Sequence, residues 1–364
     1  MPATLRPQST PTPKQPAVAL GPEGPFPNTS LRKVLERRWL HYAFLSRNHE
    51  LGMVANVAWL GPGLESPNAP PRCTSILLIH KRGEGWCASQ FNTETRIPLW
   101  SSFRQPHPVQ NSAQNSAGDD ENLHLTASAK SPSVKLQLVS SSRPCTSQCA
   151  SFAGNQHLRW QSETGVIARG DWQFKDESFK EVEAIGYHER VRGYWGWPEL
   201  GGWVFGFAND PRGPTDQPPA TAFVFTLIQP RGPEDAATGS VMVWRNGRLR
   251  RHFPRRCVTF AVRGQLQRDK VQQVPELSNL FGVPPMEPVP NQLMISARMG
   301  DDWVTYDYHC DSAARVVIPS ETSLRPFSVH EVIGPVQVEG CIGGEAFQFE
   351  TYGIAEFAGG ACDH

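Results

Sequence analysis

The sequence predicts an all-β protein with a sandwich or barrel architecture, because three patterns agree. The 364 residues include 33 Pro and 31 Gly, and both residue types disfavour helices. Short runs of apolar and β-branched residues recur between these turn-forming residues. Several runs alternate apolar and polar side chains, as Val134 to Leu138 do, and this period of two is typical of a strand with one buried face. Many short strands separated by turns indicate a sandwich or a barrel.

The expected strands follow one another along the chain, and two local signals accompany them. Asn246 and Gly247 lie between two strand-like runs, and this dipeptide favours a tight hairpin turn because it tolerates positive φ. One short helix is expected around residues 30–38, where Ser30 would cap its first turn. The expected strands cover residues 53–60, 75–80, 134–139, 202–207, 221–228, 240–244, 258–262, 293–299, 303–308, 316–318, 336–338 and 346–349.

The composition argues against several classes of function. The chain has 35 basic and 35 acidic side chains, so its formal net charge is zero, whereas nucleic acid binding normally needs a clustered cationic excess. No apolar run approaches the roughly 18–20 residues of a membrane-spanning helix. Aromatic residues make up 10% of the chain, and so many rings need a large interior. We therefore expect a globular protein with no nucleic acid partner and no integral membrane span.

Neither a targeting segment nor a metal site is predicted. Residues 1–29 form a Pro-rich tail without the apolar stretch of a signal peptide, so a cytoplasmic location is expected. The eight cysteines include one close pair, Cys145 and Cys149, whereas a structural zinc site normally needs two such pairs. We expect free thiols and no metal or other cofactor. The sequence also lacks the motifs of serine hydrolases, P-loop proteins and dinucleotide-binding folds.

The chain divides into two β-rich halves of similar size. The division falls near residues 193–202, so we expect a disordered tail over residues 1–29, a first domain over 30–197 and a second over 198–364. Residues 106–121 are polar, lack aromatic side chains and repeat Gln-Asn-Ser-Ala in altered form. This composition predicts a mobile loop inserted into the first half.

Residues 185–209 combine the densest group of aromatic rings with titratable side chains, among them Glu189. Surrounding rings lower the local polarity, which raises the pKa of a carboxyl group and permits proton donation near neutral pH. Ring faces also stabilise a developing carbocation. The stretch therefore suits a ring-walled chamber for an apolar, unsaturated ligand. In the alternative interpretation, the tryptophans fill a junction between two barrels, and Glu189 pairs with Arg190 or Arg192.

Three segments resemble the carotenoid 1,2-hydratase (hydroxyneurosporene synthase) family and its lipocalin-like relatives. Residues Gly186 to Gly193 are similar to that family's Gly-Tyr-His-Asp-His-Asn-Trp-Gly segment. Residues 334–340 and 352–359 resemble its closing strands, and residues 39–44 resemble its opening strand. The resemblance therefore extends over residues 39–359.

This resemblance implies two tandem lipocalin-like (calycin-type) β-barrels with an apolar ligand pocket and no cofactor. Members of the group hydrate isolated double bonds of carotenoids or prenylated phenols, and similar folds include natural-product cyclases of the Diels-Alderase type. Glu189 replaces the family aspartate and Arg190 replaces the following histidine. Arginine does not release a proton at useful pH, so cyclisation of a polyene, polyketide or isoprenoid is favoured over hydration. A non-catalytic carrier of an apolar metabolite is the competing class.

The resemblance and the local chemistry together give a set of candidate site residues. Glu189 is expected to donate a proton or bind a carbonyl group, while His188 and Arg190 orient it or the substrate. Hydrophobic substrate is expected to contact six aromatic side chains. They are Tyr187, Trp195, Trp197, Trp203, Tyr306 and Tyr308.

Overall fold

The computed structural model confirms the predicted all-β class. It describes residues 36–60, 72–94, 107–111, 114–118, 122–126, 132–152, 156–195, 200–214, 217–230, 238–274, 288–318 and 327–360. Within these ranges, the regular structure is β-strand apart from the single-turn 3-10 helices η2 (Arg255–Cys257) and η3 (Arg268–Lys270). No helix in this part of the chain has the length and apolar character needed to cross a membrane.

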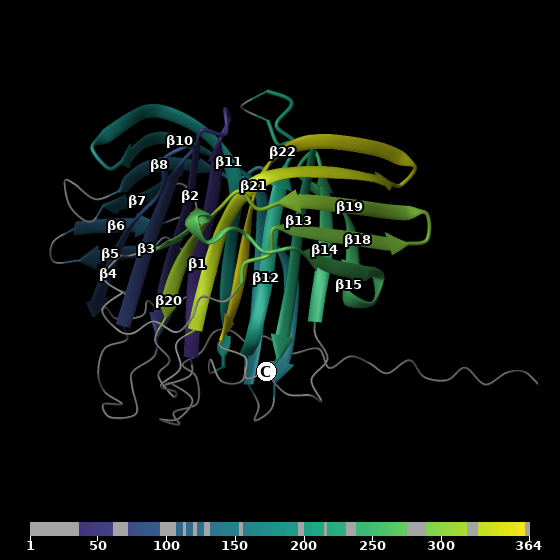
Figure 1. Cartoon of the computed structure of the whole chain (residues 1–364), viewed down its shortest axis with the longest axis horizontal. Helices are drawn as coiled ribbons and strands as arrows, with labels where there is room; N and C mark the ends of the chain where they lie inside the picture. The colour runs from purple at the N-terminus through teal and green to yellow at the C-terminus, as the bar shows by residue number, and fades with distance from the viewer. Residues whose placement is uncertain are drawn as a thin grey trace, which may run out of the picture.

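The described strands form two sheets that lie side by side (Figure 1). The first sheet has the order β4-β3-β2-β1-β11-β10-β8-β7-β6-β5, and β9 also pairs with β10. Its strands are β1 (Glu36–Ser46), β2 (Leu51–Leu60), β3 (Arg72–Lys81), β4 (Gly85–Glu94), β5 (His107–Asn111), β6 (Gln114–Gly118), β7 (Asn122–Thr126), β8 (Ser133–Val139), β9 (Cys145–Phe152), β10 (Gln156–Phe174) and β11 (Glu177–Tyr194).

The second sheet repeats much of this plan. Its order is β15-β14-β13-β12-β22-β21-β19-β18-β16, with β20 on β21 and β17 parallel to β20. Its strands are β12 (Leu200–Asn209), β13 (Thr221–Pro230), β14 (Thr238–Arg245), β15 (Arg248–Pro254), β16 (Val258–Arg263), β17 (Val271–Gln273), β18 (Gln292–Met299), β19 (Asp302–His309), β20 (Ser312–Ile318), β21 (Phe327–Ile342) and β22 (Glu345–Gly360).

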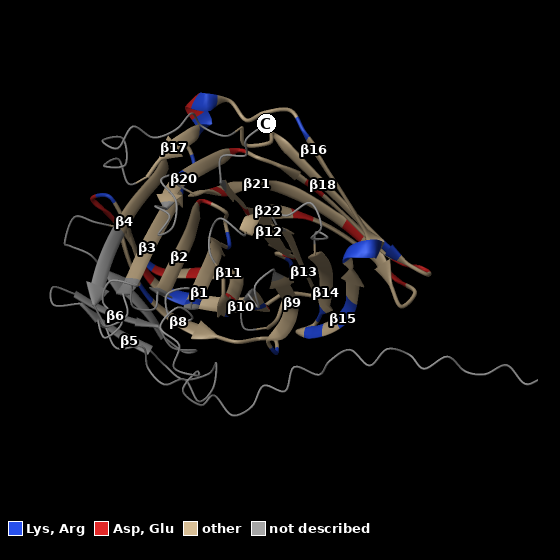
Figure 2. Ribbon diagram, turned by 90° about the horizontal axis from the view of Figure 1, so that it is seen from below, with Lys and Arg blue, Asp and Glu red and all other residues tan. Residues whose placement is uncertain are grey.

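In both sheets the first strand pairs with the last strand. β1 pairs with β11 and β12 pairs with β22, and each last strand also forms a long hairpin with a preceding strand, β10 or β21. Both sheets curve, and their first and last strands meet near the middle of the molecule (Figure 2). The two halves are therefore structural repeats whose corresponding strands face each other at this junction.

Three clusters of buried side chains fill the fold. One uses residues of the first sheet only and one uses residues of the second sheet only. The remaining cluster, which we call the junction core, combines side chains of both sheets. Side chains alternate across a strand, so Trp39 and Ala43 of β1 belong to the junction core, while Leu40 and Tyr42 belong to the core of the first sheet.

The structure differs from two local expectations and confirms a third. Residues 36–38 begin β1 rather than continuing a helix, because the consecutive residues Arg37 and Arg38 are both buried and both pair with neighbouring strands. The rest of the expected helix lies outside the described residues. Within the polar insert 106–121, strands β5 and β6 form a hairpin, and its mobility stays a prediction. The Asn246–Gly247 turn is confirmed, because both residues have positive φ, 49° and 71°, between β14 and β15.

The strands of the two sheets do not intermix along the described chain. Those of the first sheet end at Tyr194 and those of the second begin at Leu200. The division into separate domains at residues 197 and 198 stays a prediction, because the junction core joins side chains from both sides of that point.

Candidate functional site

Glu189 lies in the junction core, where it is 3% exposed. Three donors hold its carboxyl group. Trp39 Nε1 donates to Oε1 at 3.0 Å, while Trp160 Nε1 and the Tyr187 hydroxyl donate to Oε2 at 2.7 Å and 2.8 Å. The donors come from β1, β10 and β11 itself, so three adjacent strands fix this side chain.

Glu356 occupies the corresponding place in the second half. Trp203 Nε1 donates to Glu356 Oε1, as Trp39 donates to Glu189. In each half the tryptophan lies on the first strand of the sheet. Its ladder partner on the last strand is the residue two positions after the glutamate. The two indoles stack with their ring centroids 5.9 Å apart. The internal repeat therefore brings two Trp–Glu pairs together across the junction.

Glu331 of β21 adds a third carboxyl group beside Glu356. The two residues are partners in the β21–β22 ladder, so their side chains lie on the same face of the sheet. Glu331 Oε2 is buried without a hydrogen-bond partner, and so is Nε2 of His41, which lies opposite Glu189 in the β1–β11 ladder. One ligand-type atom from each of His41, Glu331 and Glu356 lies within 4.8 Å of the other two.

Burial raises the pKa values of two carboxyl groups in this cluster. Burial, followed by the nearby Glu356, raises the pKa of Glu189 from 4.5 to about 8. The same two causes, in the same order, raise the pKa of Glu331 well above its ordinary value. Burial lowers the pKa of His41 below 6.5, although Glu356 opposes this shift. At neutral pH the site therefore places the protonated carboxyl group of Glu189 beside the neutral imidazole of His41, which is a proton donor next to a proton acceptor.

His41, Glu331 and Glu356 also have the chemistry of metal ligands, since imidazole nitrogen and carboxylate oxygen both bind divalent cations. A bound cation would require both glutamates to be ionised. Burial, followed by the neighbouring Glu356, instead raises the pKa of Glu331 and so opposes its ionisation. The arrangement therefore favours a protonated Glu331 over a metal ligand.

His188 and Arg190 lie on the other face of β11 from Glu189, because alternate residues of a strand point to opposite sides. His188 stacks on Tyr42 with ring centroids 4.2 Å apart, and its Nδ1 donates to a main-chain carbonyl of β1 at 2.9 Å. Arg190 forms a buried ion pair with Glu163 at 3.0 Å. Glu163 rather than Glu189 is the ion-pair partner of Arg190 among the described residues, and the expected role of His188 and Arg190 in orienting Glu189 or the substrate stays a prediction.

The aromatic residues expected to bind substrate are divided between two cores. Three lie in the junction core with Glu189: Tyr187, Trp195 and Trp203. Tyr306 and Tyr308 instead lie in the core of the second sheet, where their rings stack 5.8 Å apart. The structure therefore does not bring these two tyrosines together with Glu189. Trp197 lies outside the described residues.

Around Glu189 the rings pack against one another, so the expected open chamber is not seen among the described residues. Trp39 meets Trp195 edge-on with centroids 5.3 Å apart, and Trp203 stacks on Phe327 at 5.1 Å. A surface cavity of about 360 Å³ lies between β19, β21, β22 and the β1–β2 turn, and Glu189 is not among its lining residues. Among the described residues, the rings next to Glu189 therefore form a packed cluster.

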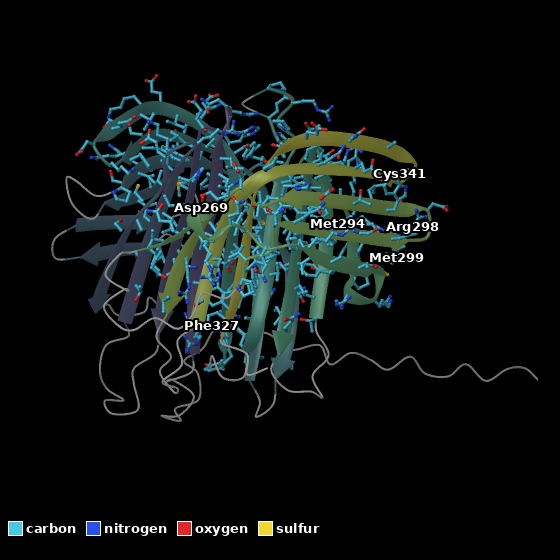
Figure 3. The ribbon with its side chains drawn as sticks, in the orientation of Figure 1. Asp269, Met294, Arg298, Met299, Phe327 and Cys341 are labelled. Atoms are coloured by element: carbon cyan, nitrogen blue, oxygen red, sulfur yellow. The ribbon has the colours of Figure 1, made fainter. Side chains whose placement is uncertain are left out.

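Residual exposure indicates the end of the junction core from which a ligand would enter. Trp39 and Glu356 are each 7% exposed, whereas Phe205 and Phe207 further along the core are 0% exposed. Phe327 lies at the same end as Trp203, and Figure 3 shows it near the lower ends of the central strands. Trp39 and Glu356 therefore keep slightly more contact with solvent than the phenyl rings of Phe205 and Phe207.

Comparison with known proteins gives structural matches only. No protein-family model matches the sequence, and no curated protein does. The crystal structure of a protein assigned as AttH from Nitrosomonas europaea matches with a TM-score of 0.59 and 14% identity, over 96% of this chain and 99% of that chain. Kievitone hydratase from Nectria haematococca matches with a TM-score of 0.53 and 11% identity, over 90% and 89% of the two chains. CghA matches with a TM-score of 0.53 and 8% identity, over 91% and 90%.

The chain shares their fold. The expected tandem lipocalin-like architecture is thereby confirmed. Identities of 8–14% establish a common fold, whereas chemistry depends on the particular residues of the site.

The sequence selects Glu189, and it also marks Glu356 as a closing-strand carboxyl group that faces a barrel interior or pairs with an arginine. His41 and Glu331 are not selected. One signal was present in the sequence. Gly-x-x-Glu occurs at residues 186–189 and again at 353–356, and the structure shows that both copies lie on the last strand of their sheet. No comparable signal marks Glu331 or His41, whose importance depends on which strands meet at the junction.

Proposed function

We propose that this protein is a cofactor-independent enzyme of specialised metabolism that acts on a hydrophobic polyene, polyketide or isoprenoid. The observation that supports the proposal is the group of buried carboxyl groups, Glu189, Glu331 and Glu356, two of which accept hydrogen bonds from indoles of the junction core. Burial raises the pKa values of Glu189 and Glu331. A neutral carboxyl group donates a proton without help from a metal or organic cofactor. The faces of nearby rings stabilise the carbocation that protonation of a double bond creates.

Hydration of a carbon–carbon double bond is the reaction that this geometry supports best. It needs an acid for the alkene and a base for the attacking water. The replacement of the family histidine by Arg190 favours cyclisation on sequence grounds alone. His41, however, provides a neutral imidazole from β1, with Nε2 unpaired beside the carboxyl groups. Kievitone hydratase, whose name states a hydration, shares the fold.

Cyclisation is the second candidate, and the dense packing of the rings favours it. An intramolecular cyclisation depends mainly on holding the substrate in a folded shape, and closely packed rings exclude the water that hydration consumes. A carrier of apolar metabolites would use the same rings. It would gain nothing from three buried carboxyl groups, because burying ionisable groups costs stability.

Incubation of the full chain with linear polyenes, polyketides and prenylated phenols tests the proposal by the mass of the product. Hydration gives a product heavier by one water, and cyclisation gives an isomer of equal mass. Recovery of every bound compound unaltered would refute the enzyme and leave the carrier. Glu189→Gln is expected to fold normally and to lower turnover by at least about tenfold. Glu350→Gln, an exposed change on the same strand as Glu356, is the control and is expected to keep the wild-type rate.

A further inference from the structure

We propose that His41, Glu331 and Glu356 form the acid–base centre of this reaction, with Glu331 as proton donor to the substrate and His41 as proton acceptor. The inference rests on the proposed function and assigns its proton transfers to particular atoms. The three residues lie on β1, β21 and β22, so the centre requires both sheets.

Two buried polar atoms without partners carry the inference. His41 is 1% exposed and Glu331 is 4% exposed, yet His41 Nε2 and Glu331 Oε2 make no hydrogen bond. A buried polar atom left unpaired costs about 1–3 kcal/mol, so each of these two atoms calls for a partner that the described side chains do not supply, and a bound substrate or water can take that place. Both atoms belong to residues of one cluster with Glu356. A neutral imidazole nitrogen offers a lone pair, and the carboxyl pair offers a proton.

Glu189 is less suited to donate the proton, although it is the residue that the sequence motif selects. Both of its oxygens already accept hydrogen bonds, from Trp39, Trp160 and Tyr187. Glu331 Oε2 has no hydrogen-bond partner among the described residues, and burial raises the pKa of this carboxyl group well above its ordinary value. We therefore assign Glu189 as a positioning residue that holds the indoles of the junction core.

The proposed hydration is balanced with water as the only co-reactant. The π electrons of the substrate double bond take the proton of the Glu331–Glu356 pair, which forms a C–H bond and leaves a cation on the adjacent carbon. The rings of Trp203 and Phe327, stacked 5.1 Å apart at this end of the core, stabilise that cation. Water forms the new C–O bond and gives its proton to His41 Nε2. His41 then returns the proton to the carboxyl pair, so the net change is the addition of one water.

Glu331→Gln tests the donor, because Gln keeps the shape of the side chain and removes the acidic proton. We expect turnover to fall at least about a hundredfold, in line with the loss of one general acid, while ligand affinity measured by tryptophan quenching changes less than about threefold. Glu339→Gln, an exposed change on the same strand, is expected to keep the wild-type rate. His41→Gln is expected to reduce turnover. Any cyclised by-product should then make up a larger fraction of all product formed. Circular dichroism checks that each variant is folded.

Infrared spectroscopy of the protein alone gives a test that does not depend on the substrate. The wild type at pH 7 should show absorption from protonated carboxyl groups, and Glu331→Gln should lose part of it. The inference is overturned if that absorption is absent from the wild type or unchanged in the variant, or if wild type and Glu331→Gln turn over a substrate equally. It is also overturned if chelator-treated protein loses activity that Zn²⁺ or Mn²⁺ restores, since the three residues would then be metal ligands. A wild type that binds every substrate and converts none refutes the proposed function instead.

Discussion

Glu189 should make the protein less stable as the pH rises, and Glu189→Gln should remove that effect. Its pKa is about 8 in the folded protein and 4.5 as an ordinary glutamate. Between these values the folded state keeps a proton that the unfolded state has released. The stabilisation from this group is therefore complete below about pH 4.5 and is lost progressively as the pH rises through 8.

The size of the effect follows from the two pKa values. Between pH 5 and pH 7 a single group with this shift lowers the free energy of unfolding by about 2.5 kcal/mol. Buried histidines act in the opposite direction. Burial lowers the pKa values of His80 and His330 to about 4, so in mild acid these residues bind protons mainly in the unfolded state. The wild-type curve therefore mixes both effects, and the difference between wild type and Glu189→Gln isolates the glutamate.

Urea unfolding at pH 5, 6, 7 and 8 measures that difference. The stability of Glu189→Gln relative to wild type should increase with pH by about 2.5 kcal/mol between pH 5 and pH 7. Any hydrogen-bond mismatch of the new amide adds an offset that does not vary with pH. Glu350→Gln, exposed on β22, should stay nearly parallel to wild type. A constant difference between Glu189→Gln and wild type across the series would show that Glu189 is ionised in the folded protein and would refute the reasoning.

Three further changes test other parts of the structure. Trp160→Phe removes the 2.7 Å donor to Glu189. It should lower the free energy of unfolding in urea by about 1–3 kcal/mol and should lower turnover. An unchanged stability would contradict the hydrogen bond. Arg190→Met leaves Glu163 buried without its ion-pair partner and should cost about 3–5 kcal/mol, much of which a second change, Glu163→Leu, should restore. Gly186→Ala places a Cβ 1.9 Å from a main-chain oxygen of β1 and should therefore lower the melting temperature. A melting temperature equal to that of wild type would contradict the close approach of β1 and β11.

The all-β class was predictable from sequence because its signals are local. The alternation of Val134 to Leu138 reappears as alternating burial along β8, and the Asn246–Gly247 turn has the positive φ values that this dipeptide favours. Aromatic side chains do lie next to the titratable segment, since Tyr187 donates a hydrogen bond to Glu189 and Trp195 and Trp203 belong to the same junction core. Their contact with a substrate stays a prediction.

The contacts of the site were not predictable, because they depend on which faces and which distant strands meet. His188, Glu189 and Arg190 are three consecutive polar residues, and all are buried, at 4%, 3% and 2% exposed. The sequence therefore shows no alternation of polar and apolar residues that would indicate which of them faces the second sheet. The hairpin of β10 and β11 supplies Glu163 to Arg190. Glu331 reaches the site because β21 pairs with β22, the last strand of the second sheet.

The pairing of the first strand with the last strand has a consequence for synthesis on the ribosome. β12 emerges early in the second half, but its partner β22, Glu345–Gly360, emerges near the end of the described chain. Until then Trp203 lacks its acceptor Glu356, and one side of β12 has no neighbouring strand. Such non-local pairing slows folding and leaves strand edges open to other chains in the meantime. Nascent chains should therefore depend on chaperones until translation of these last residues, which also complete the acid–base centre.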